Sequence, residues 1–228
     1  MNDLLYNPVF SALSTRDQHL SFGSEDVKFF DESVSPFAGF RVNHVSGFME
    51  LHSLLPNDRM ILYATPEHID IPLQWKLLVK VEGVQMLYTG NGFNSTATQL
   101  SNIVPLNDSH IPEMVALATL TRPGPFGTGT IEFGHYYGIF ENNKLVAMTG
   151  QRLHPGDYSE VSAVCTHPDH LGKGYATLLV EHQTALILEQ GYKPFLHVRA
   201  DNKRAIEIYE RLGYIINRPM NFYFMRTI

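Results

Sequence analysis

The sequence is poor in cysteine, in basic charge and in long apolar runs, and each shortage excludes a class of function. The single cysteine, Cys165, excludes an intrachain disulfide and a zinc site built on several thiolates. The 17 basic and 23 acidic residues give a formal net charge of -6, so no positive field would attract nucleic acid or an anionic lipid surface. We therefore expect no nucleic-acid partner and no membrane partner.

The chain also lacks an uninterrupted run of about 18 apolar residues, and Asp3 stands where an export signal would carry Lys or Arg. We expect neither a membrane-spanning helix nor export, and the single cysteine agrees with a reducing compartment, so a cytoplasmic protein is predicted. The 228 residues are 44% hydrophobic, which is enough for one large or two small domains with a real core.

Residues 1 to 88 combine short apolar runs with turn residues, and they predict only mixed α and β structure. Residues 89–101 are rich in Gly, Asn, Ser and Thr, a composition typical of a solvated connection. We therefore expect a smaller α+β domain over residues 1–95 and a second domain over residues 96–228. The sequence leaves open whether the first is a degenerate copy of the second, a lid or a dimer surface.

The second part has a clearer pattern of strands and helices. One helix is predicted from Asp108 or Ser109 to Leu120 and another from Gly172 to Gln190; a third begins at Asp201 or Asn202 and ends before Gly213. Thr121 to Thr130 is predicted as a loop, because its prolines and glycines cannot continue a helix. The predicted strands are 103–104, 136–140, 145–150, 160–166, 195–199, 214–217 and 222–227.

The most informative segment is the glycine-rich turn Gly172-Lys173-Gly174-Tyr175-Ala176-Thr177, between a predicted strand and a predicted helix. Amides at a helix start have no intrahelical acceptor and lie at the positive end of the helix dipole, so a phosphate can bind there. The glycines allow close approach, Lys173 adds a charge and Thr177 adds a hydroxyl donor. The plain alternative is the same turn without a ligand.

Three nucleotide-binding interpretations compete for this turn. A P-loop fails, because its last glycine is followed by Lys and then Ser or Thr, where this chain has Tyr175-Ala176. A dinucleotide fingerprint fits poorly, because Thr177 replaces its third glycine and a second mononucleotide-binding half is not expected. Coenzyme A remains, with its pyrophosphate on the turn and its pantetheine arm along the preceding strand.

Two stretches resemble motifs of the GNAT superfamily of N-acetyltransferases, in the order that the family has them. Val161 to Ala176 (VSAVCTHPDHLGKGYA) resembles motif A. Val198 to Tyr214 (VRADNKRAIEIYERLGY) resembles motif B, with its A-x-x-x-Y-x-x-x-G-[FY] helix. The likeness covers roughly residues 100 to 228, and similar enzymes with a long N-terminal extension exist. Leu171 departs from the Arg or Gln that is usual there, so one contact near the pyrophosphate is missing.

This resemblance implies an α/β (α+β) fold, in which helices flank a mixed, mostly antiparallel sheet that is splayed between strands 160–166 and 195–199. Acetyl-CoA would be the acyl donor, and no metal is implied. The backbone of Val164, Cys165 and Thr166 would pair with the pantetheine arm, and an amide there would hold the oxyanion. Gly172 to Thr177 would bind the pyrophosphate, and Asn202 would contact the cofactor arm as well as cap its own helix.

The implied reaction is direct transfer of an acetyl group to a primary amine in a ternary complex. The amine attacks as the free base, and for a lysine-like pKa near 10.4 its deprotonation costs about 4 to 5 kcal/mol at pH 7. The candidate bases are Glu160, which matches a catalytic glutamate of some relatives, and His197, which replaces an acidic residue of others. Their alternatives are a solvated carboxylate and a satisfied core or cleft-wall imidazole.

Tyr209 is the candidate acid, because the matching tyrosine of the family points at the thioester sulfur. Its phenol, with an ordinary pKa near 10, would protonate the leaving thiolate, whose thiol has a pKa near 8.5. The alternative is a core aromatic beside Ala205 and Leu212.

Other residues are assigned ordinary roles. His167-x-x-His170 lacks a third ligand, so we expect no metal site, and Cys165 is expected to be an inert buried thiol. Phe126, Phe133, Tyr136 and Tyr137 either shape the acceptor pocket or pack in the core.

We expect the acceptor to be a small-molecule or peptide amine and the chain to be a monomer or homodimer. The alternative function is a catalytically inactive acetyl-CoA-binding sensor or scaffold, which Leu171 and the unassigned base suggest.

Overall fold

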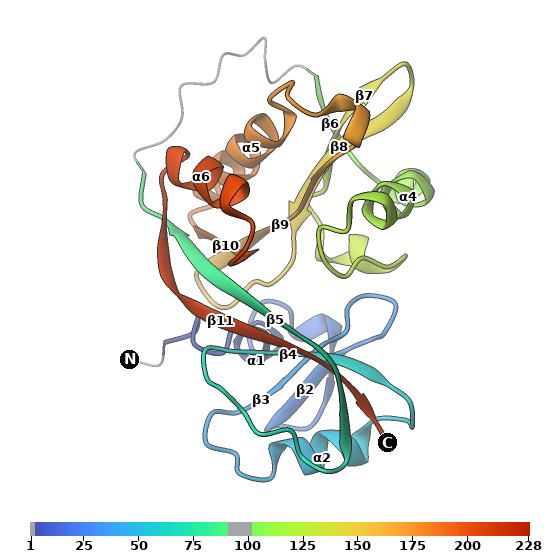
Figure 1. Cartoon of the computed structure of the whole chain (residues 1–228), viewed down its shortest axis with the longest axis vertical. Coiled ribbons are helices and arrows are strands. Elements are labelled where there is room, and N and C mark those ends of the chain that lie inside the picture. Colours follow the sequence, from blue (N-terminus) through green and yellow to red (C-terminus); the bar gives the residue numbers. More distant parts are fainter. Residues whose placement is uncertain (1–2, 91–101) are drawn as a thin grey trace.

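The computed structural model describes residues 3–90 and 102–228. In chain order its strands are β1 (Ser21–Gly23), β2 (Val27–Phe30), β3 (Phe37–Phe40), β4 (Met60–Thr65), β5 (Trp75–Tyr88), β6 (Ile103–Pro105), β7 (Tyr137–Glu141), β8 (Lys144–Gln151), β9 (Tyr158–Thr166), β10 (Lys193–Arg199) and β11 (Tyr214–Thr227). They form one eleven-stranded sheet in the order β1-β2-β3-β4-β11-β5-β10-β9-β8-β7-β6 (Figure 1). Among these described strands only the β3–β4 and β9–β10 pairs are parallel, so the predicted mostly antiparallel sheet is confirmed.

Helices cover both faces of this sheet. The described α-helices are α1 (Pro8–Leu13), α2 (Gly47–Leu54), α4 (Ile111–Thr121), α5 (Tyr175–Glu189) and α6 (Lys203–Arg211). Short 3-10 helices are η1 (Gln18–Leu20), η2 (Asp108–His110), η3 (Thr130–Phe133) and η4 (Pro168–His170). No helix in residues 3–90 and 102–228 combines the length and the apolarity needed to cross a membrane.

The helix starts follow from capping side chains. Asn202 caps α6, where its side chain accepts a hydrogen bond of 3.2 Å from the amide of Ala205, so one of the two predicted caps is confirmed. The predicted start at Asp108 or Ser109 was wrong by one residue. Asn107 is the cap there, because a turn of 3-10 helix precedes α4 and the Asn107 side chain accepts from the amide of Ser109 at 3.1 Å.

Two long strands of 14 residues each, β5 and β11, run side by side diagonally through the middle of the molecule (Figure 1). Their register runs from Tyr214 opposite Tyr88 to Thr227 opposite Trp75. The two separate strands predicted for 214–217 and 222–227 are therefore one strand with a bulge before Arg218. Pro219 of β11 precedes Asn221, where the pairing with β4 begins. The amide hydrogen that proline lacks is therefore not needed for a hydrogen bond to β4.

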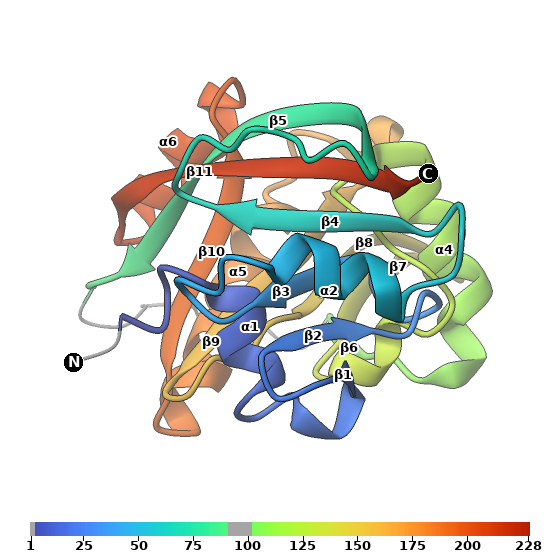
Figure 2. The same cartoon turned by 90° about the horizontal axis from the view of Figure 1, so that it is seen from below.

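The sheet joins the early and late parts of the chain, because β11 lies between β4 and β5 (Figure 2). The boundary predicted near residue 95 lies outside the described residues. One hydrophobic cluster also contains side chains from both parts, among them Val9, Phe37, Met114, Met148 and Cys165. A second cluster places α2 against β4, β5 and β11 on the other face.

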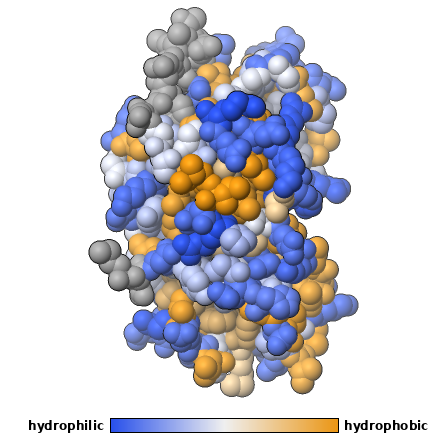
Figure 3. Space-filling model, turned by 60° about the vertical axis from the view of Figure 1, so that its left-hand side comes forward, coloured by the Kyte–Doolittle hydropathy of each residue, from blue (hydrophilic) through white to orange (hydrophobic). Residues whose placement is uncertain are grey.

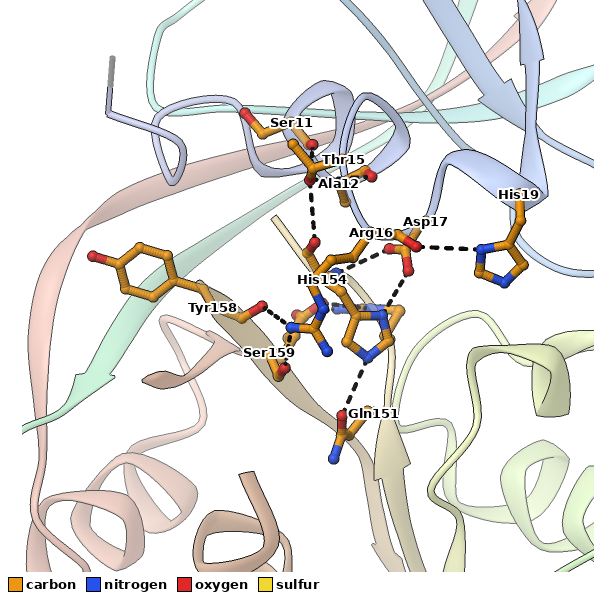
Figure 4. Close-up of polar contacts among 12 residues, drawn as sticks. Ser11, Ala12, Thr15, Arg16, Asp17, His19, Gln151, His154, Tyr158 and Ser159 are labelled. Atoms are coloured by element: carbon orange, nitrogen blue, oxygen red, sulfur yellow. Dashed lines mark hydrogen bonds and ion pairs between the residues drawn. The ribbon is translucent and has the colours of Figure 1, made fainter. Parts of the chain in front are cut away.

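A buried polar contact ties the segment after α1 to the loop between β8 and β9 (Figure 4). His154 Nδ1 lies 2.6 Å from Asp17 Oδ1, and the His154 amide donates to Asp17 Oδ2 at 2.9 Å. Arg16 donates to the hydroxyl of Ser159 at 2.9 Å and lies over the ring of Tyr192 at 3.5 Å. Both side chains of the Asp17–His154 pair are buried, so the contact favours one arrangement of the two segments.

Most of the surface seen in Figure 3 is hydrophilic, and apolar side chains gather at mid-height and along the lower right side. Exposed apolar side chains on β11 include Ile215 and Ile216, which are 52% and 49% exposed.

Candidate active site

The edge of β9 that faces β10 is unpaired over most of its length. The parallel pairing of β9 and β10 covers three positions and ends at Phe195 opposite Glu160. From Val161 to Thr166 the only strand partner among the described residues is β8, on the opposite edge. The splay implied by the family resemblance is therefore present, and it leaves free backbone groups that an extended ligand arm can pair with.

A β-bulge in the middle of β9 changes the direction in which its side chains point. Ala163 has a positive φ of 52°, and the β8–β9 register shifts between Met148 and Gly150. As a result Ala163 and Cys165 pack with α4, whereas Val164 packs in the cluster that contains α5 and α6.

Two side chains with a buried polar group lie near the end of β9. The Thr166 hydroxyl is buried and has no hydrogen-bond partner among the described residues. Cys165 is buried, and burial raises its pKa to about 11 despite weak hydrogen bonds, so the thiol is not an activated nucleophile.

The glycine-rich turn leads directly into α5. The first bond of the helix is from the Leu178 amide to the Gly174 carbonyl, at 3.1 Å, and the amides from Gly172 to Thr177 have no acceptor among the described residues. Gly172 and Gly174 have φ values of 81° and 79°, and a Cβ at either position would meet no atom within 4 Å. The turn thus presents free amides at a helix start to open space, which fits a pyrophosphate.

Lys173 does not extend freely from this turn. Its Nζ contacts the Glu141 carboxylate at 2.7 and 2.9 Å, and the Tyr175 hydroxyl donates to the same carboxylate. Hydrogen bonds from Lys173 and Tyr175 lower the Glu141 pKa to about 2. The sequence analysis missed Glu141, because it lies 32 residues before Lys173 and no local spacing connects the two.

Glu160 lies where β9 and β10 diverge and is wholly buried. Its carboxylate accepts hydrogen bonds from Arg152 Nε at 2.9 Å and Nη2 at 2.5 Å, and from His197 Nδ1 at 2.8 Å. Burial alone would raise the Glu160 pKa, but the charge of Arg152 and the bond from His197 hold it at about 2. Neither sequence-based alternative anticipated this environment, since Glu160 is not solvated and Arg152 was not singled out.

The hydrogen bonds around His197 define its tautomer. Nδ1 donates to Glu160, because a carboxylate only accepts. Nε2 lies 3.1 Å from the Gln85 amide nitrogen, which also donates to the Leu5 carbonyl at 2.9 Å, while Gln85 Oε1 accepts from Asn217. With Gln85 so oriented, the lone pair of His197 Nε2 is the acceptor.

Tyr209 lies on α6 in the same cluster as Val164. It is half-buried, its ring packs against Tyr214 with centroids 6.1 Å apart, and its hydroxyl has no hydrogen bond among the described residues. Burial raises the Tyr209 pKa to about 12, so the phenol keeps its proton at neutral pH.

A pocket adjoins the bulge of β9 on the α4 side. Phe126 and Tyr136 line it, whereas Phe133 packs against Phe30 and Tyr137 against His182. Its full lining is Pro123, Gly124, Pro125, Phe126, Thr130, Tyr136, Arg152, Ser162 and Ala163. The predicted loop after α4 therefore forms one wall of the pocket.

The N-terminal part of the chain holds this loop in place. The Gly129 amide donates to the Ser33 carbonyl at 3.0 Å, and the Thr130 hydroxyl donates to the Val34 carbonyl at 2.9 Å. A Cβ at Gly127 would lie 2.6 Å from the Ser33 oxygen, so the close approach requires glycine there.

No group of three or more His, Cys, Asp or Glu side chains placed to bind a metal occurs in the parts of the chain that the structure describes. His167 and His170 lie at the two ends of η4, where the His167 ring accepts a bond from the Asp169 amide.

Comparisons with known proteins agree with this geometry. Residues 136–223 match the family model described as FR47-like protein. The chain is similar to a crystal structure of a GNAT-family acetyltransferase from Novosphingobium aromaticivorans, with 31% identity, full coverage of both chains (100% each) and a TM-score of 0.92. No curated protein matches the chain.

Two further solved structures share the fold at low identity. A GCN5-related N-acetyltransferase from Kribbella flavida matches at 13% identity and a TM-score of 0.64, over 96% of this chain and 95% of that one. A GNAT-family acetyltransferase from Colwellia psychrerythraea matches at 14% and 0.54, over 98% of each chain.

Proposed function

Because the chain belongs to the GNAT family of N-acetyltransferases, and is thus an acyltransferase, we propose that it transfers the acetyl group of acetyl-CoA directly to a primary amine within a ternary complex. One observation carries the proposal. The unpaired edge of β9 is followed, after η4, by the free amides of residues 172–177, so a single ligand with an extended arm and a pyrophosphate fits both.

The donor-binding roles follow from these features. The amides of Gly172 to Thr177 bind the pyrophosphate, and Lys173 adds its charge when it exchanges Glu141 for phosphate. The backbone of Val164, Cys165 and Thr166 pairs with the pantetheine arm. Asn202 contacts the same arm from the start of α6 while it caps that helix.

In the proposed reaction the amine nitrogen forms a bond to the thioester carbonyl carbon, and the carbon–sulfur bond breaks. The amine loses a proton and the thiolate gains one. We assign the first transfer to His197, whose Nε2 lone pair can receive a proton when a water replaces the Gln85 amide. Glu160 accepts a hydrogen bond from His197 Nδ1 and orients the ring, and its pKa of about 2 makes it a poor base by itself.

Tyr209 is the proposed acid for the thiolate. Its hydroxyl is uncommitted, and its pKa of about 12 keeps it protonated throughout the neutral range. A phenol of that pKa is a weak acid, but a thiolate that leaves beside it in a poorly solvated site receives the proton readily.

The test is amine-dependent release of the CoA thiol from acetyl-CoA by purified protein, over a panel of amino acids, peptides, polyamines and aminoglycosides. We expect release with at least one acceptor and the matching acetylated product by mass spectrometry. Binding of acetyl-CoA without release across the panel would favour the sensor or scaffold instead.

A further inference from the structure

Arg152 uses only part of its guanidinium to hold Glu160. Nε and Nη2 bond the carboxylate, whereas Nη1 has no hydrogen bond among the described residues. Nη1 lies 3.8 Å from the position of a Cβ at Gly124, on the wall of the pocket beside the β9 bulge. The Arg152 side chain is 13% exposed, and its guanidinium lies over the ring of Phe37 at 4.8 Å, so its direction is set by packing.

The remaining polar groups of the pocket divide into satisfied and free ones. The Thr130 hydroxyl accepts from the Gly127 amide and donates to Val34, and the Tyr136 hydroxyl donates to the Gln151 carbonyl. The Ser162 hydroxyl makes no hydrogen bond among the described residues. The free donors of the pocket are therefore Arg152 Nη1 and Ser162 Oγ.

The charge of this lining discriminates between classes of amine. None of the described residues that line the pocket is acidic, and the one charged group is a guanidinium. A second ammonium group on an acceptor would find no free carboxylate there, because Glu160 is engaged by Arg152 and His197. A carboxylate would be attracted and would accept hydrogen bonds from both free donors.

We infer that the acceptor is an amine that also carries a carboxylate, as an amino acid does, and that Arg152 and Ser162 bind this carboxylate. The inference rests on the proposed acetyl transfer. Ser162 and Ala163 belong to β9 immediately before Val164, so a carboxylate held there keeps the amine beside the unpaired edge. The apolar part of the acceptor packs against Pro125 and Phe126.

The first experiment compares three acceptors that share the same isobutyl group, leucine, leucinamide and isoamylamine, with the wild-type protein. Rates are expressed per concentration of free base, so that their different amine pKa values do not enter. We expect kcat/KM for leucine to exceed that for the other two by about 10- to 100-fold, the range for a hydrogen bond to a charged group. Equal values, or a preference for isoamylamine, would overturn the inference while leaving acetyl transfer intact.

Two variants test whether Arg152 and Ser162 cause the preference for leucine. Arg152→Lys keeps a positive charge beside Glu160 but removes the second donor, and Ser162→Ala removes the hydroxyl alone. Each should lower the ratio of kcat/KM for leucine to kcat/KM for isoamylamine, while KM for acetyl-CoA changes little; Arg152→Lys also slows both acceptors, because Arg152 holds the Glu160 carboxylate that orients His197. Arg16→Lys is the matched control, because Arg16 is also fixed by packing and hydrogen bonds but lies outside the pocket. A leucine preference that survives both pocket variants would contradict the assignment.

If Arg152→Lys does not fold, Ser162→Ala and the comparison of acceptors with the wild-type protein still test the proposed carboxylate site. If no amine at all supports release of CoA thiol, the proposed function fails, and calorimetric binding of N-acetylleucine against N-acetylisoamylamine tests the pocket directly. Tighter binding of N-acetylleucine, weakened in Ser162→Ala, supports the carboxylate site. Equal binding refutes it.

Discussion

Tyr209 differs from two other tyrosines near the site in having an uncommitted hydroxyl. The hydroxyl of Tyr136 donates to the Gln151 carbonyl, and that of Tyr214 is bonded to Thr184, whereas that of Tyr209 has no partner among the described residues. Tyr209 is half-buried, and its hydroxyl is not among the buried polar atoms without a partner in the described residues, so a ligand can reach this hydroxyl. This contrast motivates its assignment as the acid.

We predict that Tyr209→Phe lowers kcat by about 100-fold or more, the usual contribution of a positioned acid. KM for acetyl-CoA and the free energy of unfolding should change little, because no hydrogen bond of the folded state is lost. Tyr214→Phe is the control, since it removes a hydroxyl that is bonded to Thr184. It should lower stability and leave kcat unchanged; an unaltered kcat in Tyr209→Phe would remove that residue from the mechanism.

Glu160 predicts a specific dependence of stability on pH. Its folded-state pKa of about 2 lies below the ordinary 4.5, so the stabilisation from its ionised form is complete above about pH 4.5. It is lost as the pH falls from about 4.5 to 2. The wild-type free energy of unfolding should fall through this window in urea titrations, and Glu160→Gln should remove that part of the slope.

The same substitution should cost about 3 to 5 kcal/mol at pH 7, because it leaves the buried Arg152 without its counter-ion. Asp201→Asn serves as the comparison. Its ion pair with Arg199 is exposed, so its loss should change stability little. Equal slopes in wild type and Glu160→Gln would show that other carboxylates dominate acid unfolding.

At the scale of elements, α5 offers two glycines in the same backbone conformation at its opposite ends. Gly174 precedes the helix and Gly191 follows it, with φ values of 79° and 80°, and neither has an atom within 4 Å of an added Cβ. Alanine at either position carries a similar conformational strain of about 1 kcal/mol. Comparison of the two alanine variants therefore separates the effect of backbone strain from the effect of lost ligand contact.

We predict that Gly174→Ala raises KM for acetyl-CoA by about 10-fold, equivalent to 1.4 kcal/mol, because the methyl group stands between the pyrophosphate and the amides. Gly191→Ala should show the same loss of stability in thermal unfolding but an unchanged KM. If both variants bind acetyl-CoA like the wild type, the turn does not hold the phosphates.

The sequence predicted elements whose signals are local. Asn202 as a cap and the hairpin of β7 and β8 follow from neighbouring residues, and the structure contains both. β5 could be placed only in a mixed region, and β11 was divided at Pro219, because their partners lie far away in the chain. Whether a proline interrupts a strand depends on which edge is paired, and pairing is a tertiary property.

The residues of the candidate site also divide into those with a local sequence signal and those without one. The turn at 172–177 is continuous in sequence and was recognised from its own residues, although its ligand is still a proposal. Arg152, Gln85 and Glu141 were missed, because each contacts the site from another element. The Gln85–His197 contact spans 112 residues, and no periodicity connects positions so far apart.

At the scale of the whole molecule, the shared sheet predicts one cooperative unfolding transition. β11 bonds to β4 and β5, the largest cluster contains residues of both halves, and Asp17 pairs with His154 across them. Opening one half would expose these contacts in the other.

The single tryptophan makes this measurable, because Trp75 is buried in the cluster around α2, far in sequence from α5 and α6. Tryptophan fluorescence and far-ultraviolet circular dichroism should give coincident midpoints and equal m-values in urea. A fluorescence transition at lower urea would indicate that residues 1–95 unfold as a separate unit.

The contact between Ser33 and the loop after α4 also tells a protein engineer where acceptor choice can be altered. Gly127 and Gly129 are closed to any larger side chain, since a Cβ at either would lie within about 3 Å of Ser33 atoms. Random libraries that include these two positions would therefore consist largely of misfolded members. Diversity confined to Pro125, Phe126 and Ser162 would remodel the pocket wall while the scaffold beneath it stays intact.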